Sequence, residues 1–378
     1  MAEVKNMKWF YTQPVDIHFE SGAISKLPSI LAEKQLQKGL LICDPFLVSN
    51  GVAGQIMESS QGRIAGIYSH ITPNPRLNEV DSCANQLRCM EADFAIALGG
   101  GSSMDCAKAA CAIAKTDETI RPFFEGIQPL PASPLPLIAI PTTAGTGSEV
   151  TCVSVLSDPD KKVKKPISSD SLYPSLVLID PTLTISVPPK VTASTGMDVL
   201  SHALEGYWSK NHQPICDALA LHAAELVFQY LPEAYRNGQN LLAREKMCEA
   251  SVIAGLAFSL PKTAASHACS FPLTSLYGIP HGEACAFTLG ALCRINASAE
   301  EGRVEKFAKK LGFSNTEEMA QRIDAMKKEM GLACTLSDAG IQKEDISSLA
   351  VKCLHPNLRN NPVELSLTDL ENMFVSLE

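Results

Sequence analysis

The sequence predicts an α/β protein in two parts: a doubly wound parallel-sheet domain over residues 1–188, followed by an all-helical domain over residues 189–378. Three observations support this fold class. Short, uniformly apolar runs alternate with helical patterns in the first half. Each run stops at glycine, proline or an Asp-Pro pair. After the prolines at 188 and 189, long helical patterns replace the apolar runs. Strands that are apolar at every position are typical of a parallel sheet covered by helices on both faces.

Four strands are expected in the first half, at residues 39–43, 94–98, 137–140 and 176–179. They end in Asp44-Pro45, in three glycines, at Pro141 and at Asp180-Pro181, and a helical pattern follows the glycines over residues 103–115. Ligands of such sheets bind at the carboxyl ends of the strands, so the loops after these runs are the expected ligand site.

The second half shows apolar residues at three- and four-residue spacing, for example over 214–229 and 243–257, which predicts helices. The stretch after about residue 299 alternates charged and apolar residues and is typical of amphipathic helices.

The composition limits the classes of function. With 378 residues, 46% of them hydrophobic, the chain can bury a large core, and its net charge of -9 argues against nucleic acid as the main partner. Thirteen cysteines without a C-x-x-C pair indicate reduced thiols that behave as small buried hydrophobes, Cys285 among them. With no apolar leader near the start and no apolar run of membrane-spanning length, we expect a cytoplasmic protein.

The motif Gly99-Gly100-Gly101-Ser102-Ser103 lies directly between a predicted strand and a predicted helix. Glycines let the backbone approach a phosphate, and the free N–H groups of a helix N-terminus bind it. A glycine-rich turn without a ligand is the alternative. The motif is not the G-x-G-x-x-G fingerprint, so it gives only weak support for a standard dinucleotide-binding fold.

Two other strand ends have polar residues that suit a dinucleotide. Asp44 could accept hydrogen bonds from the adenosine ribose, which would favour NAD over NADP, or it could merely cap the helix before Pro45. The loop 141–149 contains Thr142 and Thr143 among glycines, and on its own it could equally be a polar loop.

The helical half contains a candidate metal site. Asp198 and His202 are four residues apart and would project from one helix face, and His267 and His281 follow. Three imidazoles and a carboxylate suit a divalent first-row metal, although each histidine alone is more often an ordinary core or surface residue.

At this point the motifs resemble one family along essentially the whole chain, the iron-containing (group III) alcohol dehydrogenases. The matching segments are Pro73-Asn74-Pro75, residues 99–108, 141–151, Asp180-Pro181, 195–198, 202–205 and Pro280-His281-Gly282. The resemblance implies a dehydroquinate synthase-like fold, with the active site between the two domains. It implies metal binding by Asp198, His202, His267 and His281, with Fe²⁺ expected and Zn²⁺ or Mn²⁺ as alternatives.

The resemblance also implies NAD(H) as the cofactor. The implied contacts are Asp44, Asn74, Gly99, Gly100, Gly101, Ser102, Ser103, Thr142, Thr143, Thr151, Lys164 and Leu183. Lys164 belongs to a basic cluster, Lys161, Lys162, Lys164 and Lys165, that composition alone would assign to a solvated turn.

The chain departs from the family pattern at one position. Many members have a second histidine four residues after the third ligand, and here that position is Phe271. A phenyl ring cannot transfer a proton, so another group, a water or the ribose hydroxyls would have to supply it.

This departure resembles the branch that reduces sulfoacetaldehyde and phosphonoacetaldehyde. Lys262, five residues before His267, would select an aldehyde with an anionic head, with Ser266 as a hydroxyl donor and Phe271 beside the substrate. Lys262 in solvent is the alternative. We expect reduction of sulfoacetaldehyde to isethionate, with phosphonoacetaldehyde as the close rival and a short-chain alcohol or diol dehydrogenase next.

Two further classes stay open: a dehydroquinate synthase-type lyase, which would need more basic residues and would regenerate its NAD, and a non-catalytic protein that keeps the fold. A homodimer is expected because closed twofold dimers are the commonest assembly.

Overall fold

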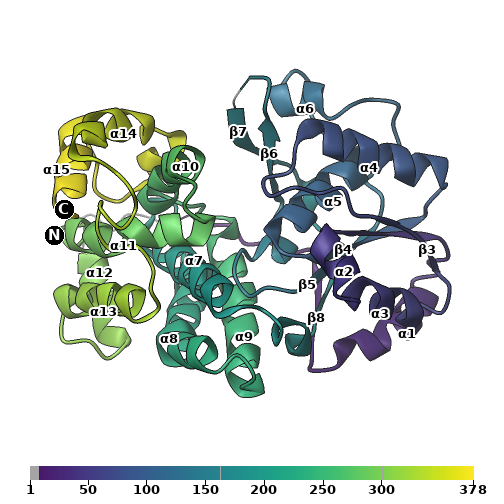
Figure 1. The fold of residues 1–378 in the computed structure, drawn as a ribbon, viewed down its shortest axis with the longest axis horizontal. Coiled ribbons are helices and arrows are strands. Elements are labelled where there is room, and N and C mark those ends of the chain that lie inside the picture. Colours follow the sequence, from purple (N-terminus) through teal and green to yellow (C-terminus); the bar gives the residue numbers. More distant parts are fainter. Residues whose placement is uncertain (1–7, 162, 300–301) are drawn as a thin grey trace.

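The computed structural model describes residues 8–161, 163–299 and 302–378. The expectations for residues 1–7 and for Lys162 therefore lie outside the described residues. Figure 1 shows two parts: the sheet with α1 to α6 on one side, and the helices from α7 onward on the other. This arrangement confirms the predicted fold class. The predicted division at 188/189 stays a prediction; η4 ends at Thr184 and α7 begins at Pro189.

A six-stranded sheet, parallel in every pairing, forms the first part, in the order β1-β8-β5-β4-β2-β3. The strands are β1 Asp16–Phe19, β2 Gly39–Cys43, β3 Ile64–Tyr68, β4 Phe94–Gly99, β5 Leu137–Pro141 and β8 Leu176–Ile179. The order reverses between β2 and β4, since β3 follows on one side while β5 and β8 follow on the other. Ligands of doubly wound sheets bind at such a switch point, here between Asp44 and Gly99.

Each central strand is buried on both faces, because alternate side chains enter two different cores. Leu40, Ile42, Ala95 and Ala97 pack with α4 and α5, whereas Leu41, Ile96, Leu98 and Ile140 pack with α1 and α3. This is why the central strands are apolar at every position.

The remaining elements of the first part connect and cover the sheet. They are η1 Ala23–Lys26, α1 Leu27–Glu33, α2 Pro45–Ser49, α3 Val52–Ser59, α4 Leu77–Cys89, α5 Gly101–Ile113, α6 Arg121–Glu125, η2 Ser148–Val150, η3 Asp170–Leu172 and η4 Pro181–Thr184. An antiparallel pair, β6 Val153–Asp158 and β7 Val163–Ser168, stands apart from the main sheet.

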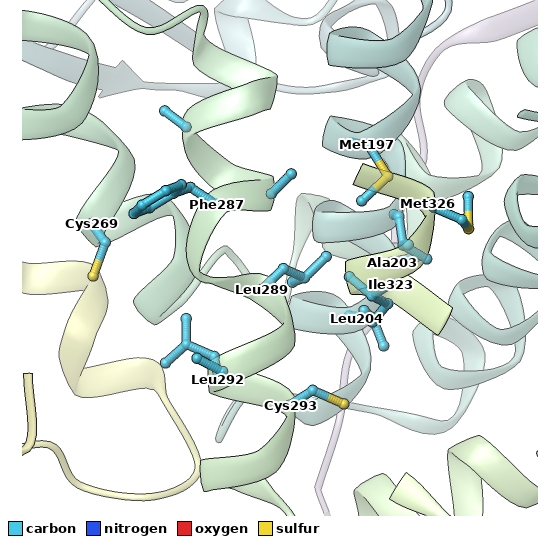
Figure 2. Close-up of a cluster of buried hydrophobic side chains, with 14 of the residues drawn as sticks. Met197, Ala203, Leu204, Cys269, Phe287, Leu289, Leu292, Cys293, Ile323 and Met326 are labelled. Carbon is cyan, nitrogen blue, oxygen red and sulfur yellow. The ribbon is translucent and has the colours of Figure 1, made fainter. Parts of the chain in front are cut away.

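The second part is helical throughout its described residues. Its elements are α7 Pro189–Trp208, α8 Pro214–Arg236, α9 Leu241–Ser259, α10 Ala265–Tyr277, α11 His281–Asn296, α12 Arg303–Lys310, α13 Thr316–Glu329, η6 Lys343–Asp345, α14 Ile346–Lys352, η7 Pro356–Asn360 and α15 Leu367–Val375. One apolar core joins them. Figure 2 shows Met197, Leu204, Phe287, Leu289 and Met326 in this core, which fixes α7, α11 and α13 against one another.

The loop after β5 joins the two parts. The backbone N–H of Gly145 donates to Ser251 Oγ on α9 at 2.8 Å, and a Cβ at Gly147 would lie 2.5 Å from Gly255 Cα. Only glycine allows this backbone approach. No described helix is long and apolar enough to cross a membrane.

Candidate active site

The glycine motif forms the turn from β4 into α5. Gly99 has φ +142°, and a Cβ there would lie 2.6 Å from Ser103 Oγ. Gly100 is the N-cap of α5 and provides no side-chain cap. The first N–H groups of a 13-residue helix are thus left without a side-chain acceptor at the switch point of the sheet. Such a helix N-terminus suits a phosphate group.

Asp44 is a helix cap, as one of its two sequence interpretations predicted, and its contact with a ribose stays a prediction. Its Oδ1 accepts from the N–H groups of Phe46 and Leu47 at 2.9 and 3.2 Å, so it is the N-cap of α2. Its Oδ2 lies toward Gly99, 3.5 Å from where a Cβ would stand. One oxygen caps the helix while the other faces the turn where a ribose would lie.

Asn74, Ser102 and Lys164 come together beside this turn. The N–H of Asn74, a non-glycine residue at φ +60°, donates to Ser102 Oγ at 3.2 Å, and Lys164 Nζ donates to Asn74 Oδ1 at 2.5 Å. Burial lowers the pKa of Lys164, and the charges of Asp105, Cys285 and Asp198 act against that shift. Lys164 is half-buried, whereas Lys161 is exposed. Its neighbours place Lys164 near both the glycine turn and the candidate metal ligand Asp198.

The threonines of the loop after β5 differ in their positions and in their hydrogen bonds. The N–H of Thr142 donates to Gly99 O at 3.1 Å, and Thr143 Oγ1 lies 3.1 Å from where a Cβ of Gly100 would be. Thr151 is buried, and its hydroxyl is already bonded to Lys108 and to Ser148. Thr151 thus holds the loop in place, while Thr142 and Thr143 border the glycine turn. Leu183 lies half-buried in η4 against the sheet core.

The four candidate metal ligands come from three helices. Asp198 and His202 lie one turn apart on α7, His267 on α10, and His281 is the first residue of α11. His202 Nε2 and His267 Nε2 are 3.0 Å apart, and Asp198 Oδ1 lies 3.9 and 3.6 Å from them. The rings of His267 and His281 are 5.5 Å apart between centroids. Two nitrogens on one metal at about 2.0–2.1 Å lie about 3.0–3.4 Å apart, so these separations fit a shared ion.

The donor set has the chemistry that a cation requires. Asp198 is 3% exposed, and its Oδ1 has no hydrogen-bond partner among the described residues. Burial opposes ionisation of Asp198, but His202, His281 and His267 hold its pKa below the usual value. Burial lowers the pKa of His202 to about 4 and that of His281 to about 3, so both rings are neutral near pH 7 and have a free lone pair.

Glu205 is a functional candidate that the sequence interpretation missed. It is fully buried, and its Oε2 lies 2.6 Å from His267 Nδ1 and accepts from the N–H of Ala264 at 2.9 Å. A carboxylate on Nδ1 fixes the ring so that Nε2 faces the metal. Glu205 follows Asp198 by two helical turns on α7, which is a signal that the sequence contains.

The residues expected at the substrate lie around α10. Lys262 is exposed, at φ +69°, and makes no ion pair with the described part of the chain; its carbonyl accepts from Asn360 Nδ2 at 3.3 Å. Phe271 is half-buried one turn after His267, with its ring 4.6 Å from the ring of His355.

Ser266 does not fit the role expected for it. It is fully buried, and its hydroxyl donates to Cys285 O at 2.7 Å. This hydroxyl is committed to holding α10 against α11, so we assign Ser266 to helix packing instead of substrate contact.

A cavity of about 710 Å³ lies elsewhere, between α11, α13 and α15. None of the predicted site residues lines it, and the chemistry described above gives no role to it.

The chain is similar to known proteins along most of its length. Residues 14–181 match the model of iron-containing alcohol dehydrogenases, and residues 192–377 match the C-terminal model of the same family. A crystal structure of sulfoacetaldehyde reductase from Bifidobacterium kashiwanohense in complex with NAD⁺ is 50% identical with a TM-score of 0.96, covering 98% of this chain and 99% of that one.

Two curated relatives have different substrates in their names. A sulfoacetaldehyde reductase of Bilophila wadsworthia is 33% identical over 90% of this chain and 92% of its own length. A 1-propanol dehydrogenase of Citrobacter freundii is 41% identical over 71% of this chain and 70% of its own length.

Proposed function

The chain belongs to the iron-containing alcohol dehydrogenase family, and from that premise we propose that it reduces a small anionic aldehyde, sulfoacetaldehyde first, to its primary alcohol with NADH. The observation that carries the reaction class is the buried cluster of Asp198 and three histidines with an unpartnered carboxylate oxygen. The substrate rests on the 50% identity over 98% of the chain to a sulfoacetaldehyde reductase.

The cofactor half of the site would position NADH. The N-terminus of α5 would bind the pyrophosphate, the free oxygen of Asp44 the adenosine ribose, and Lys164 with Asn74 the part nearer the metal residues. Hydride transfer is the chemistry that this cofactor supplies when bound.

The helical half would hold a divalent metal on Asp198, His202, His267 and His281. Lewis acidity toward the aldehyde oxygen is the chemistry that such an ion supplies when bound. Glu205 orients His267, and the ring of Phe258 stacks on His202 at 4.1 Å with an interplanar angle of 9°, which fixes the second imidazole.

Phe271 excludes proton transfer at its position, because its ring has no exchangeable proton. Its nearest polar aromatic neighbour is His355, whose Nδ1 accepts from the N–H of Asn357 at 3.2 Å. Another group, a water or a hydroxyl of the cofactor ribose would have to supply the proton to the developing alkoxide.

Lys262 is the proposed selector for the anionic head. Its backbone is fixed, because Asn360 Nδ2 donates to the carbonyls of Pro261, Lys262 and Thr263 at 2.8, 3.3 and 3.1 Å, while its ammonium is in solvent. A fixed stem with an unpaired cation suits recognition of a sulfonate or phosphonate.

The test compares kcat/KM of the iron(II)-loaded enzyme for sulfoacetaldehyde, phosphonoacetaldehyde and propanal. We expect the highest kcat/KM with sulfoacetaldehyde. Lys262→Met should lower kcat/KM about tenfold or more for both anionic aldehydes, because a hydrogen bond to a charged group contributes about 1.5–3 kcal/mol. Propanal should be unaffected.

Lys210→Met is the matched control, since Lys210 is an exposed lysine whose N–H donates to Asn360 O. Equal use of propanal by the wild type would remove the anion selectivity and leave a general aldehyde reductase. Conversion of a substrate without net consumption of NADH would instead favour the synthase-type lyase.

A further inference from the structure

The thiol of Cys285 lies inside the candidate metal site, although the sequence suggested only a small buried hydrophobe. Cys285 follows His281 by one turn on α11, is fully buried, and has its Sγ 3.8 Å from His281 Nε2. The ligand atoms of Asp198, His267, His281 and Cys285 all lie within 4.8 Å of one another. This compact set includes the thiol and does not include His202.

These separations fit direct ligation. With metal–nitrogen and metal–sulfur bonds of about 2.0–2.1 and 2.3 Å, neighbouring nitrogen and sulfur ligands of a five-coordinate ion lie about 3.1–3.8 Å apart, for ligand angles of 90–120°. The observed 3.8 Å lies at the upper end of this range.

A further observation supports a ligand at this point. Asp198, 3% exposed, has an unpartnered Oδ1 within the same set. Proximity in sequence to a ligand does not by itself place a cysteine there: Cys269, two residues after His267, is equally buried, but its thiol pairs with Cys353, just after the end of α14.

We propose that Cys285 Sγ is a further ligand of the metal, beside the aspartate and the histidines. This rests on the proposed metal-dependent function. On binding, the Sγ–H bond breaks, the proton leaves to solvent, and a sulfur lone pair forms the bond to the metal, with no change of oxidation state. A thiolate donor favours Zn²⁺, Co²⁺ and Fe²⁺ over the harder Mn²⁺.

The test uses the colour of bound cobalt, which does not depend on substrate or turnover. Metal-free full-length protein is titrated anaerobically with Co²⁺ while its absorption spectrum is recorded. We expect a thiolate-to-cobalt charge-transfer band in the near ultraviolet beside the visible d–d bands. The charge-transfer band should be absent in Cys285→Ser and Cys285→Ala and present in the matched control Cys269→Ala.

A second measurement detects the sulfur in the wild type, and a variant then tests its effect on metal preference. X-ray absorption of the zinc-loaded wild type should show one sulfur scatterer at about 2.3 Å. The affinity ratio of Zn²⁺ to Mn²⁺ should fall about tenfold or more in Cys285→Ser, because a hard hydroxyl replaces a soft thiolate.

The outcomes separate this proposal from the proposed function. Cobalt bound with d–d bands but no charge-transfer band, together with a zinc site without sulfur, would overturn ligation by Cys285 and leave the proposed function standing. A wild type that binds neither cobalt nor zinc would overturn both.

Discussion

Glu205 is the residue whose environment says most about the site. Fully buried carboxylates are rare, and this one satisfies the first N–H groups of α10 as well as His267 Nδ1. A single side chain on α7 thus fixes both the start of α10 and the ring of His267, the candidate ligand on α10.

Replacing Glu205 with Gln should weaken metal binding about 10- to 100-fold, the usual effect of losing a partner behind a histidine ligand. The amide is nearly isosteric but provides only one acceptor oxygen for the N–H groups and the imidazole. Competition with a chromogenic chelator measures the affinity. Glu283→Gln is the control, because Glu283 is buried on α11 but accepts from the N–H of Ala333. Equal affinity in Glu205→Gln and wild type would contradict the role of Glu205.

Lys108 is the second informative residue. It is 1% exposed, and its Nζ donates to Ser148 Oγ, Thr151 O, Thr151 Oγ1 and Val153 O at 2.9–3.2 Å. It thereby ties α5 to the loop that borders the glycine turn.

Lys108→Met should lower the free energy of unfolding by about 3 kcal/mol or more, since several buried acceptors lose their donor. It should also raise the KM for NADH, because the loop between β5 and β6 is no longer held. Urea unfolding and steady-state kinetics measure the two effects. Lys115→Met is the control: this exposed lysine beyond the end of α5 donates only to Pro134 O. If both variants were equally stable, the buried network would not hold the loop.

At the scale of elements, α7 and α11 approach each other at Gly282. A Cβ there would lie 2.1 Å from Ser194 O and 2.9 Å from Asp198 Cβ. Both helices provide candidate metal ligands, so their separation would set the size of the proposed site.

Gly282→Ala should therefore force α7 and α11 apart and lower the metal content of the purified protein. Overpacking a core in this way costs about 1–3 kcal/mol or more. Gly54→Ala is the opposite case, because nothing lies within 4 Å of that position on α3, and it should stabilise the protein by about 0.5–1 kcal/mol. Metal analysis and thermal unfolding compare the two. Full metal content in Gly282→Ala would contradict this prediction, because it would show that α7 and α11 can accommodate the added methyl group without loss of the metal site.

The elements also show what sequence can predict. The expected strands at 39–43, 94–98, 137–140 and 176–179 are β2, β4, β5 and β8, because strands buried on both faces are apolar throughout. β1 lies at a sheet edge with exposed side chains, and β6 alternates buried with half-exposed residues, so neither produced an apolar run. β3, Ile64–Tyr68, lies at the other edge and was not predicted, although its side chains are mostly apolar.

The site follows the same logic. Asp198 and His202 share a helix face by their spacing alone, whereas His267 and His281 reach them only through the packing of α10 and α11, which no local pattern specifies. Cys285 has the same four-residue spacing from His281, but its small apolar neighbours favoured a hydrophobic interpretation. The roles assigned to the site residues stay predictions until they are measured.

For the whole molecule, the many buried thiols predict sensitivity to alkali. Burial raises the pKa of Cys43, Cys248 and Cys293 to about 12, against 9.0 in an exposed thiol. Between these values the unfolded chain binds fewer protons than the folded one, so stability is intact below pH 9 and falls as pH rises toward 12.

The free energy of unfolding should therefore fall above pH 9 by on the order of 1.4 kcal/mol per pH unit for each such thiol. Urea titrations with reductant from pH 8 to pH 10.5 measure the slope. Cys248→Ala should give a shallower slope, whereas Cys89→Ala, which removes an exposed thiol, should keep the wild-type slope. A free energy of unfolding that stays constant over this pH range would contradict the prediction.

The homodimer and the cytoplasmic location stay predictions as well.

The most direct test of metal-dependent, NADH-linked reduction follows NADH absorbance while sulfoacetaldehyde is added to metal-free protein, before and after iron(II) is restored anaerobically. We predict no turnover without metal and, after iron(II) is restored, one NADH consumed per alcohol formed. Full turnover in the metal-free protein, or no NADH consumption in the iron-loaded one with any aldehyde, would contradict it.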